Sequence, residues 1–181
     1  PEPFSSLAAA CPALYDRTVT INGLSKSHAM TGWRMGYCGG PASLVTAMAT
    51  IQGQSTGNAS SISQYAAIAA LTGPQECVAE MCREYRRRHD FVVAGLNDIP
   101  GISCRPGWGT FYAFADVTNA MAAVGCADDV AFTEHLLESV GVAVVPGAGF
   151  GCEGHVRVSF AVAEPTLVDA LARIRKAVGF S

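Results

Sequence analysis

Lys26 and Arg34 are the residues whose types and spacing most clearly indicate chemistry. Lys26 is one of two lysines in the chain and lies among small and apolar residues. Such surroundings, with a second cation nearby, favour the neutral, nucleophilic form of an amine. Arg34 carries a planar, permanently charged guanidinium that suits phosphate, and Ser25 adds a hydroxyl donor. These three groups are what a phosphorylated aldehyde cofactor requires, although a surface loop with ordinary charges would contain the same residue types.

Two short strands are predicted to position these residues. A β-branched run over residues 18–21 predicts a buried strand, ended by the turn pair Asn22-Gly23. Lys26 is then expected in a loop at the end of that strand. A second strand is predicted over residues 34–38, and Gly39-Gly40 closes it. Arg34 would therefore begin the strand that follows the lysine loop.

Three helices are predicted next. The first begins at Pro41, because a proline at the first helical position loses no hydrogen bond, and it runs to about residue 52. A break over Gly53–Gly57 separates it from a helix over about 60–71, and a long helix follows over about 74–97. Helical spacing predicts a buried face on the first helix. That face comprises Leu44, Val45, Met48 and Ile51. The polar side of the long helix, with Arg86, Arg87 and Arg88, is interpreted as solvated.

The second half of the chain has a different pattern of elements, typical of a small α+β domain packed beside an α/β one. A helix is expected to end at Gly141, a good residue for the end of a helix. Another begins near Pro165, and a glycine-rich loop covers residues 146–154. The predicted strands span residues 102–104, 110–114, 142–145 and 155–160, and the first of these helices spans residues 127–140.

Arg157 is a second candidate for binding an anion. It lies in the middle of a predicted strand between Val156 and Val158, where a buried charge is costly unless it is paired. An arginine on the solvent face of an alternating strand would give the same pattern. The residues alone leave these two interpretations about even.

The segment Ser25-Lys26, followed by Met30-Thr31-Gly32-Trp33-Arg34-Met35-Gly36-Tyr37, resembles the pyridoxal-phosphate lysine motif of class I/II aminotransferases. The likeness is closest to the bacterial aspartate-aminotransferase-like branch and covers nearly the whole chain. It implies that Lys26 forms the Schiff base with pyridoxal 5′-phosphate and that Arg34 binds the cofactor phosphate, to which the Ser25 hydroxyl is expected to be a further donor. It also implies that Arg157, in a Val-Arg-Val-Ser-Phe strand, holds the substrate α-carboxylate through a bidentate pair.

The resemblance further implies the architecture. The expected fold is α/β: the C-terminal part of the large, three-layer α/β/α domain of pyridoxal-phosphate-dependent transferases over residues 1–87, then a small α+β domain over 88–181. It implies a homodimer in which Asn58 lies near the interface and contributes to substrate binding. The other role considered for Asn58, as a polar cap at the start of a helix, is at least as well supported by the sequence.

The function implied is transfer of an amino group from an amino acid to a 2-oxo acid. The chain opens Pro1-Glu2-Pro3-Phe4 and is expected to be the second part of something longer. The family's residues around the pyridine ring lie upstream of this part, so these 181 residues alone are expected to be an incomplete catalyst. Residues 51–57 contain no arginine for a side-chain carboxylate, and Gly23 stands where some subgroups carry serine. Aspartate with 2-oxoglutarate is one plausible substrate pair, and alanine, aromatic or other amino donors remain open.

Functions outside the aminotransferases also stay open at this point. Ser55 lies in a Gly-x-Ser-x-Gly match to the nucleophile turn of α/β-hydrolases, but that turn must follow a strand and here follows a helical pattern. Residues 149–154 match a dinucleotide fingerprint, yet a strand rather than a helix follows them. A different pyridoxal enzyme of the same fold type, such as a lyase or C–C ligase, would share the lysine motif. A non-catalytic fragment or dimer partner would share it as well.

Bulk properties limit the partners. A formal net charge of −3 gives no reason to expect binding to nucleic acid or an anionic membrane. No apolar run approaches the length of a membrane span. The seven cysteines are an odd number without a Cys-x-x-Cys pair, which favours reduced thiols in a cytoplasmic protein. The scattered histidines give no clustered ligands for zinc.

Overall fold

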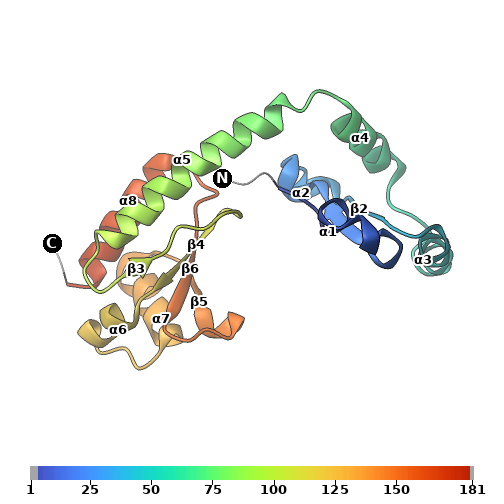
Figure 1. Ribbon diagram of the computed structural model, residues 1–181. Coiled ribbons are helices and arrows are strands. Elements are labelled where there is room, and N and C mark those ends of the chain that lie inside the picture. The colour runs from blue at the N-terminus through green and yellow to red at the C-terminus, as the bar shows by residue number, and fades with distance from the viewer. Residues whose placement is uncertain (1–3, 180–181) are drawn as a thin grey trace. The chain divides into compact units, whose positions relative to one another are not determined.

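The computed structural model describes residues 4–179, and the chain divides between Glu80 and Met81 into two compact units of mixed helix and strand. The division falls inside α5 (Glu76–Asn97), which is labelled in Figure 1. Each unit is described separately. The assignment of residues 1–87 to a large domain and 88–181 to a small one remains a proposal.

The first unit is built around a two-stranded antiparallel sheet. Strand β1 (Thr20–Gly23) pairs with β2 (Gly36–Gly39), with Thr20 opposite Gly39 and Gly23 opposite Gly36. The other elements of this unit are α1 (Leu7–Ala10), the 3₁₀ turns η1 (Pro12–Arg17) and η2 (Thr31–Trp33), and the helices α2 (Leu24–Ser27), α3 (Ala42–Ser55) and α4 (Ser61–Thr72).

The predicted turn at Asn22-Gly23 is wrong, because both residues belong to β1 and pair with Tyr37 and Gly36. A Cβ at Gly36 would lie 3.3 Å from the Asn22 carbonyl oxygen, so glycine suits the close approach of the two strands. Cross-strand pairing therefore overrides the local turn preference. The chain turns one residue later, and Lys26 lies in the short helix α2 rather than in an open loop.

The predicted buried face of α3 is also wrong for this unit. Leu44, Met48 and Ile51 are exposed, Ile51 to 70%. On α4, Ser63 and Ala67 are buried, whereas Ile62 and Tyr65 are exposed. The helices form where the periodicity predicts them, but among residues 4–80 no element covers their large apolar side chains. Pro41 precedes α3 as its cap residue, and Gly53 lies inside the helix.

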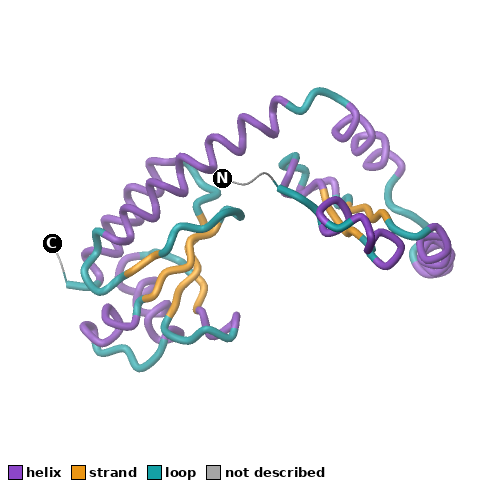
Figure 2. Tube along the Cα trace, viewed as in Figure 1, coloured by secondary structure: helices purple, strands orange, loops and turns teal. Residues whose placement is uncertain are grey.

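The second unit contains a four-stranded antiparallel sheet in the order β3-β4-β6-β5. Its strands are labelled in Figure 1 and drawn in orange in Figure 2. In β4 and β6, Phe114 lies opposite Arg157 and Ala115 opposite Val156. The elements are the rest of α5, β3 (Ser103–Cys104), β4 (Tyr112–Asp116), α6 (Thr118–Val124), α7 (Asp129–Val140), β5 (Val145–Pro146), η3 (Gly147–Phe150), β6 (His155–Ser159) and α8 (Glu164–Ala177).

The core of the second unit lies against one face of this sheet. Because side chains alternate along a strand, Ala113, Ala115 and Val156 point into the core, while Phe114 and Arg157 lie on the outer face. Helices α5, α7 and α8 bury apolar residues in the same cluster. These include Val92 and Leu96 from α5, Phe132 and Leu136 from α7, and Leu167 and Ile174 from α8.

The C-terminal end of α7 matches the sequence prediction, whereas its start lies at Asp129, two residues after the predicted one. The Asp128 carboxylate accepts a hydrogen bond of 2.8 Å from the Ala131 N–H at its start, and Gly141 follows its last residue with a left-handed φ of 67°. Helix α6 was not predicted. It is only seven residues long, which is too short to give a clear periodic signal.

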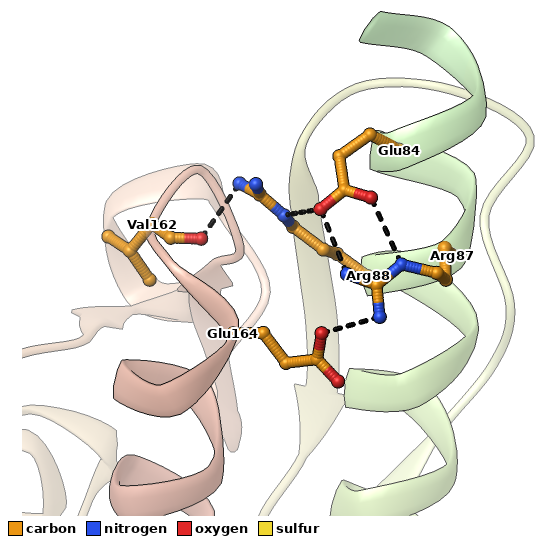
Figure 3. Close-up of polar contacts among 5 residues, drawn as sticks. All are labelled: Glu84, Arg87, Arg88, Val162 and Glu164. Atoms are coloured by element: carbon orange, nitrogen blue, oxygen red, sulfur yellow. Dashed lines mark hydrogen bonds and ion pairs between the residues drawn. The ribbon is translucent and has the colours of Figure 1, made fainter. Parts of the chain in front are cut away.

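The arginines of α5 are not simply solvated. Arg87 forms ion pairs with Glu84 on its own helix and with Glu164 at the start of α8. Arg88 binds Glu84 and donates a hydrogen bond of 2.8 Å to the Val162 carbonyl oxygen. Figure 3 shows these contacts joining the two helices. Within residues 4–179, no helix combines the length and apolarity that a membrane span requires.

Candidate functional site

The register of the β1–β2 hairpin places Lys26, Ser25 and Arg34 at the same end of the sheet. Gly23 lies opposite Gly36 in the last pair of the ladder, and Ser25 and Lys26 follow Gly23 in α2. Arg34 comes two residues before Gly36 and ends the turn η2, which packs against α2. Lys26 and Arg34 thus lie at one end of the hairpin, as expected, but Arg34 precedes β2 and does not begin that strand as the sequence predicts.

The segment that carries these residues is closed by backbone hydrogen bonds to Leu24, which is fully buried. The Leu24 N–H donates to the Met35 carbonyl over 3.2 Å, and the Met30 N–H donates to the Leu24 carbonyl over 3.2 Å. Lys26 lies between these closures, with its side chain exposed and Ser25 half-buried beside it. The backbone of one buried residue, Leu24, thus holds both ends of the turn in which Lys26 lies.

Backbone strain is concentrated in the same segment. Ala29 and Arg34 have left-handed φ values of 52° and 51°, a region that residues other than glycine rarely adopt. In residues 4–179, Thr110 is the one other non-glycine residue with a positive φ. Each such residue costs on the order of 1 kcal/mol, and strain of this kind clusters at functional sites. The lysine segment therefore carries a feature beyond residue type that points to function.

The Arg34 guanidinium uses only part of its N–H donors within the segment. Its Nη1 donates a 3.2 Å hydrogen bond to the Thr31 carbonyl, which fixes the guanidinium against its own turn. A guanidinium has five N–H donors, so several remain for an anion. The exposed position of Arg34 makes those donors accessible to a ligand.

A hydrogen-bonded chain that the sequence did not predict lies beside the lysine. Ser27 Oγ lies 2.9 Å from His28 Nδ1, and His28 Nε2 lies 3.3 Å from Gln75 Oε1. The Gln75 amide nitrogen donates to two backbone carbonyls, so its Oε1 is an acceptor and His28 Nε2 is the donor to it. Because Gln75 is 47 residues from His28, no local pattern could have revealed the contact.

Asn58 is exposed and lies between α3 and α4, one residue after Gly57 with its φ of 77°. The cap residue of α4 is Ser60, so the interpretation of Asn58 as a helix cap is wrong. Among residues 4–179, the Asn58 side chain has no hydrogen-bond partner.

Arg157 lies in the second unit, half-buried on the outer face of the sheet. Its guanidinium carbon lies 4.3 Å from the centre of the Tyr112 ring and 4.7 Å from the centre of the Phe150 ring. Within the described part of the chain, no carboxylate pairs with it. The cation is thus stabilised by aromatic rings, which leave its N–H groups without an anionic partner.

The two competing motifs lack the structural context that they need. Ser55 is the last residue of α3, whereas a hydrolase nucleophile turn joins a strand to a helix. Residues 149–154 lead into strand β6, whereas a dinucleotide fingerprint opens a helix. Neither glycine pattern has the geometry of its motif.

The sequence profile of the family described as aminotransferase class I and II matches residues 5–174. The chain belongs to this family. The match covers both units and includes Lys26, Arg34, Asn58 and Arg157. Membership alone does not assign a role to any of these residues.

Relatives within the aminotransferase family agree with this placement. The chain is 49% identical over 177 residues to the aspartate/prephenate aminotransferase of Nitrosomonas europaea, covering 94% of this chain and 45% of that protein. It matches the crystal structure of the Rhizobium meliloti aspartate aminotransferase with a TM-score of 0.89 and 43% identity, covering 97% of this chain and 45% of the other. The aromatic aminotransferase of Pyrococcus horikoshii matches with a TM-score of 0.83 and 35% identity, covering 93% and 44%. The chain therefore spans a little under half the length of these aminotransferases.

Proposed function

We propose that this chain is the lysine-bearing part of a pyridoxal-phosphate-dependent aminotransferase, which transfers an amino group from an amino acid to a 2-oxo acid. The observation that carries the proposal is the strained hairpin end that holds Ser25, Lys26 and Arg34 together. The chain's similarity to proteins named aspartate/prephenate and aspartate aminotransferase supports transamination over a lyase or C–C ligase reaction.

The residues at the hairpin end fit pyridoxal 5′-phosphate by the chemistry of their donors. A primary amine suits an aldehyde, while a guanidinium with several available N–H groups and a hydroxyl suit a phosphate. Lys26 would hold the aldehyde carbon, and Arg34 with Ser25 would hold the phosphate. When bound, the cofactor supplies an electron-withdrawing ring that stabilises negative charge at the substrate Cα.

Lys26 has a second role in this proposal. With the cofactor bound, the Lys26 amine would accept the proton from the substrate Cα and later give it up again, acting as general base and then as general acid. The position of Lys26 in a turn anchored by buried Leu24 supports this role, because proton transfer needs a fixed amine.

Arg157 would bind the substrate α-carboxylate. A planar guanidinium pairs with a carboxylate through two parallel hydrogen bonds, which fix orientation as well as charge. The absence of a carboxylate partner for Arg157 within residues 4–179 supports this role. Asn58 would contribute to substrate binding from the loop between α3 and α4, where its amide is exposed.

The amino donor is proposed to be aspartate, with 2-oxoglutarate as a plausible acceptor. The names of the bacterial relatives support this donor. The similarity to an aromatic aminotransferase keeps aromatic donors as the second candidates. Residues 51–57 contain no arginine, so a side-chain carboxylate would be bound elsewhere in the enzyme.

A homodimer is also part of the proposal. Ile51, Ile62 and Tyr65 expose large apolar surfaces on α3 and α4, with Tyr65 exposed to 77%. Apolar surface of this extent usually marks a contact with further protein. These helices flank the loop that carries Asn58, which is consistent with a role for Asn58 close to an interface.

The two lysines of the chain provide an internal control for this function. The enzyme, prepared at the full length that its gene encodes, should retain pyridoxal phosphate after dialysis and change its visible absorbance when aspartate is added. Lys26→Ala should abolish this change, whereas Lys176→Ala should leave it intact. Formation of oxaloacetate and glutamate from aspartate and 2-oxoglutarate would identify transamination. Different products, or an unchanged signal in the Lys26→Ala variant, would contradict the proposal.

A further inference from the structure

The strongest unassigned feature of the second unit is the pair of rings around Arg157. Tyr112 comes from β4 and Phe150 from the end of η3, so the rings reach the guanidinium from separate segments. Phe150 also packs edge-on against Phe114, at 6.1 Å between ring centres and 87° between ring planes. The arginine therefore lies in an aromatic setting built by two segments of the chain, β4 and η3.

The turn that carries Phe150 is held rigidly in place. The buried carboxylate of Asp129, which is 1% exposed at the start of α7, accepts a 2.7 Å hydrogen bond from the Ala148 N–H. A Cβ on Gly147 would overlap the Cys152 carbonyl oxygen and lie 2.8 Å from His155 Cβ. The first residue of the turn is therefore packed without room for a side chain, and the backbone that carries Phe150 is anchored at Gly147 and Ala148.

The backbone just before Tyr112 is also held in a conformation that is rare for a residue other than glycine. Thr110 has a left-handed φ of 67°, and its hydroxyl oxygen accepts a 3.1 Å hydrogen bond from the Tyr112 N–H. The Tyr112 ring then packs against Phe111, with 4.4 Å between ring centres. Strain of this kind persists only where the surrounding structure holds it, so the start of β4 is locally fixed.

We propose that Tyr112 and Phe150 are positioning residues that hold the Arg157 guanidinium in one orientation for a substrate carboxylate. A long arginine side chain on a sheet surface has many rotamers, and each must be given up before a bidentate pair can form. Rings that contact the guanidinium restrict these rotamers in advance, without taking up its N–H donors as a carboxylate partner would. This inference rests on the proposed role of Arg157 and adds the two residues that make that role effective.

Kinetics and binding of the holoenzyme, prepared at the full length that its gene encodes, test the inference. Phe150→Leu and Tyr112→Leu remove one ring each, while Phe150→Tyr and Tyr112→Phe keep it. The readouts are KM and kcat for L-aspartate, and the Kd of 3-phenylpropionate, a carboxylate that does not react. Each ring-removing variant should raise KM and Kd about three- to tenfold, as expected from the strength of a cation–π contact, with kcat nearly unchanged. The ring-keeping variants should match the parent protein.

Arg157→Gln separates the failure of this inference from the failure of the proposed function. If Arg157→Gln weakens carboxylate binding but both ring-removing variants bind as the parent does, positioning by the rings is wrong and the role of Arg157 stands. If Arg157→Gln binds as the parent does, both are wrong. A fall in kcat without a change in KM also overturns the inference. If the circular dichroism of a leucine variant shows that its fold has changed, the methionine variant at the same position is measured in its place. Methionine lacks the ring but fills a similar volume.

Discussion

At the scale of single residues, Arg34 joins two features that are costly to combine. Its backbone is in the left-handed region, and its guanidinium is tied to the carbonyl of Thr31 three residues earlier. An ordinary surface arginine needs neither feature. Both make sense if the guanidinium must point from a fixed place toward a bound anion, because a fixed donor loses less entropy on binding.

Replacement of Arg34 should therefore weaken cofactor binding. We expect Arg34→Gln to raise the Kd for pyridoxal phosphate about 10- to 100-fold, because a hydrogen bond to a charged group contributes about 1.5–3 kcal/mol. Arg17→Gln is the matched control, since Arg17 is another exposed arginine of the first unit. Equilibrium dialysis with the cofactor measures both. Equal affinity in the Arg34→Gln and Arg17→Gln variants would remove Arg34 from the phosphate site.

The sequence indicated candidate site residues more successfully than it indicated the contacts that those residues make. Lys26, Ser25 and Arg34 could be selected because their types and spacing form a continuous motif. The contacts of Arg157 with Tyr112 and Phe150 were missed, because they depend on strand register and on a turn that the alternating pattern does not fix. The capping role considered for Asn58 was wrong because the helix begins two residues later than a cap at position 58 would require.

At the scale of elements, the turn η3 contains two glycines in contrasting environments. Gly147 has no space for a Cβ, because backbone atoms of Cys152 and His155 occupy it. Gly149 has no atom within 4 Å of the same position and no positive φ. The same glycine-to-alanine substitution is therefore expected to destabilise the protein at Gly147 and to have little effect at Gly149.

Gly147→Ala should destabilise the second unit by about 1–3 kcal/mol, the usual cost of forcing extra volume into a packed site. Gly149→Ala should leave stability within about 0.5 kcal/mol of the parent, as for most surface substitutions. Urea unfolding followed by circular dichroism measures the difference. Similar stability of the two variants would mean that η3 is not held as closely as its contacts indicate.

The ion-pair network between α5 and α8 gives an expected pH dependence. Hydrogen bonds from Arg87 and then Arg88 lower the pKa of Glu84 from 4.5 to about 2. Because the folded-state pKa is lowered, the stabilisation is fully present above the unfolded pKa of about 4.5 and is lost as pH falls toward 2. Glu84 is exposed to solvent, so salt should weaken the effect.

Comparison of the parent with Glu84→Gln tests this network. The parent should be the more stable protein at neutral pH, and the difference in unfolding free energy should shrink as pH falls from about 5 to about 2. Glu80→Gln, a substitution at another glutamate of α5, is the control. A difference that stays constant over this pH range would show that the Glu84 carboxylate does not contribute through its charge.

Helices and strands were largely predictable because their signals are local. The end of α7, for example, follows from Gly141. The end of β1 was not predictable in this way, because Asn22-Gly23 favours a turn in isolation and is extended only through pairing with β2. The environment of the apolar face of α3 was not predictable either, because the spacing of apolar residues does not indicate which segment packs against them.

At the scale of the whole molecule, the chain spans about 45% of the length of the Nitrosomonas relative. The exposed apolar side chains of α3 and α4 are consistent with cover by further protein, either a second copy of the chain, as proposed above, or the remaining part of the enzyme. Both the homodimer and the complete pyridoxal site belong to that larger assembly in our proposal.

These 181 residues alone should not catalyse robust transamination when supplied with pyridoxal phosphate, aspartate and 2-oxoglutarate. Joined to the part of the Nitrosomonas relative that precedes the matching region, the same residues should recover turnover, because the groups around the pyridine ring would then be supplied. A coupled assay for oxaloacetate measures both preparations. Robust turnover by the verified 181-residue chain would contradict this expectation.

The most direct measurement concerns the amine of Lys26. The enzyme is incubated with pyridoxal phosphate, reduced with borohydride to make the bond between lysine and cofactor permanent, digested and mapped by mass spectrometry. A pyridoxyl group should be found on the peptide that contains Lys26 and be absent from the peptide that contains Lys176. A cofactor bound only at Lys176, or at neither lysine, would contradict the central role given to Lys26.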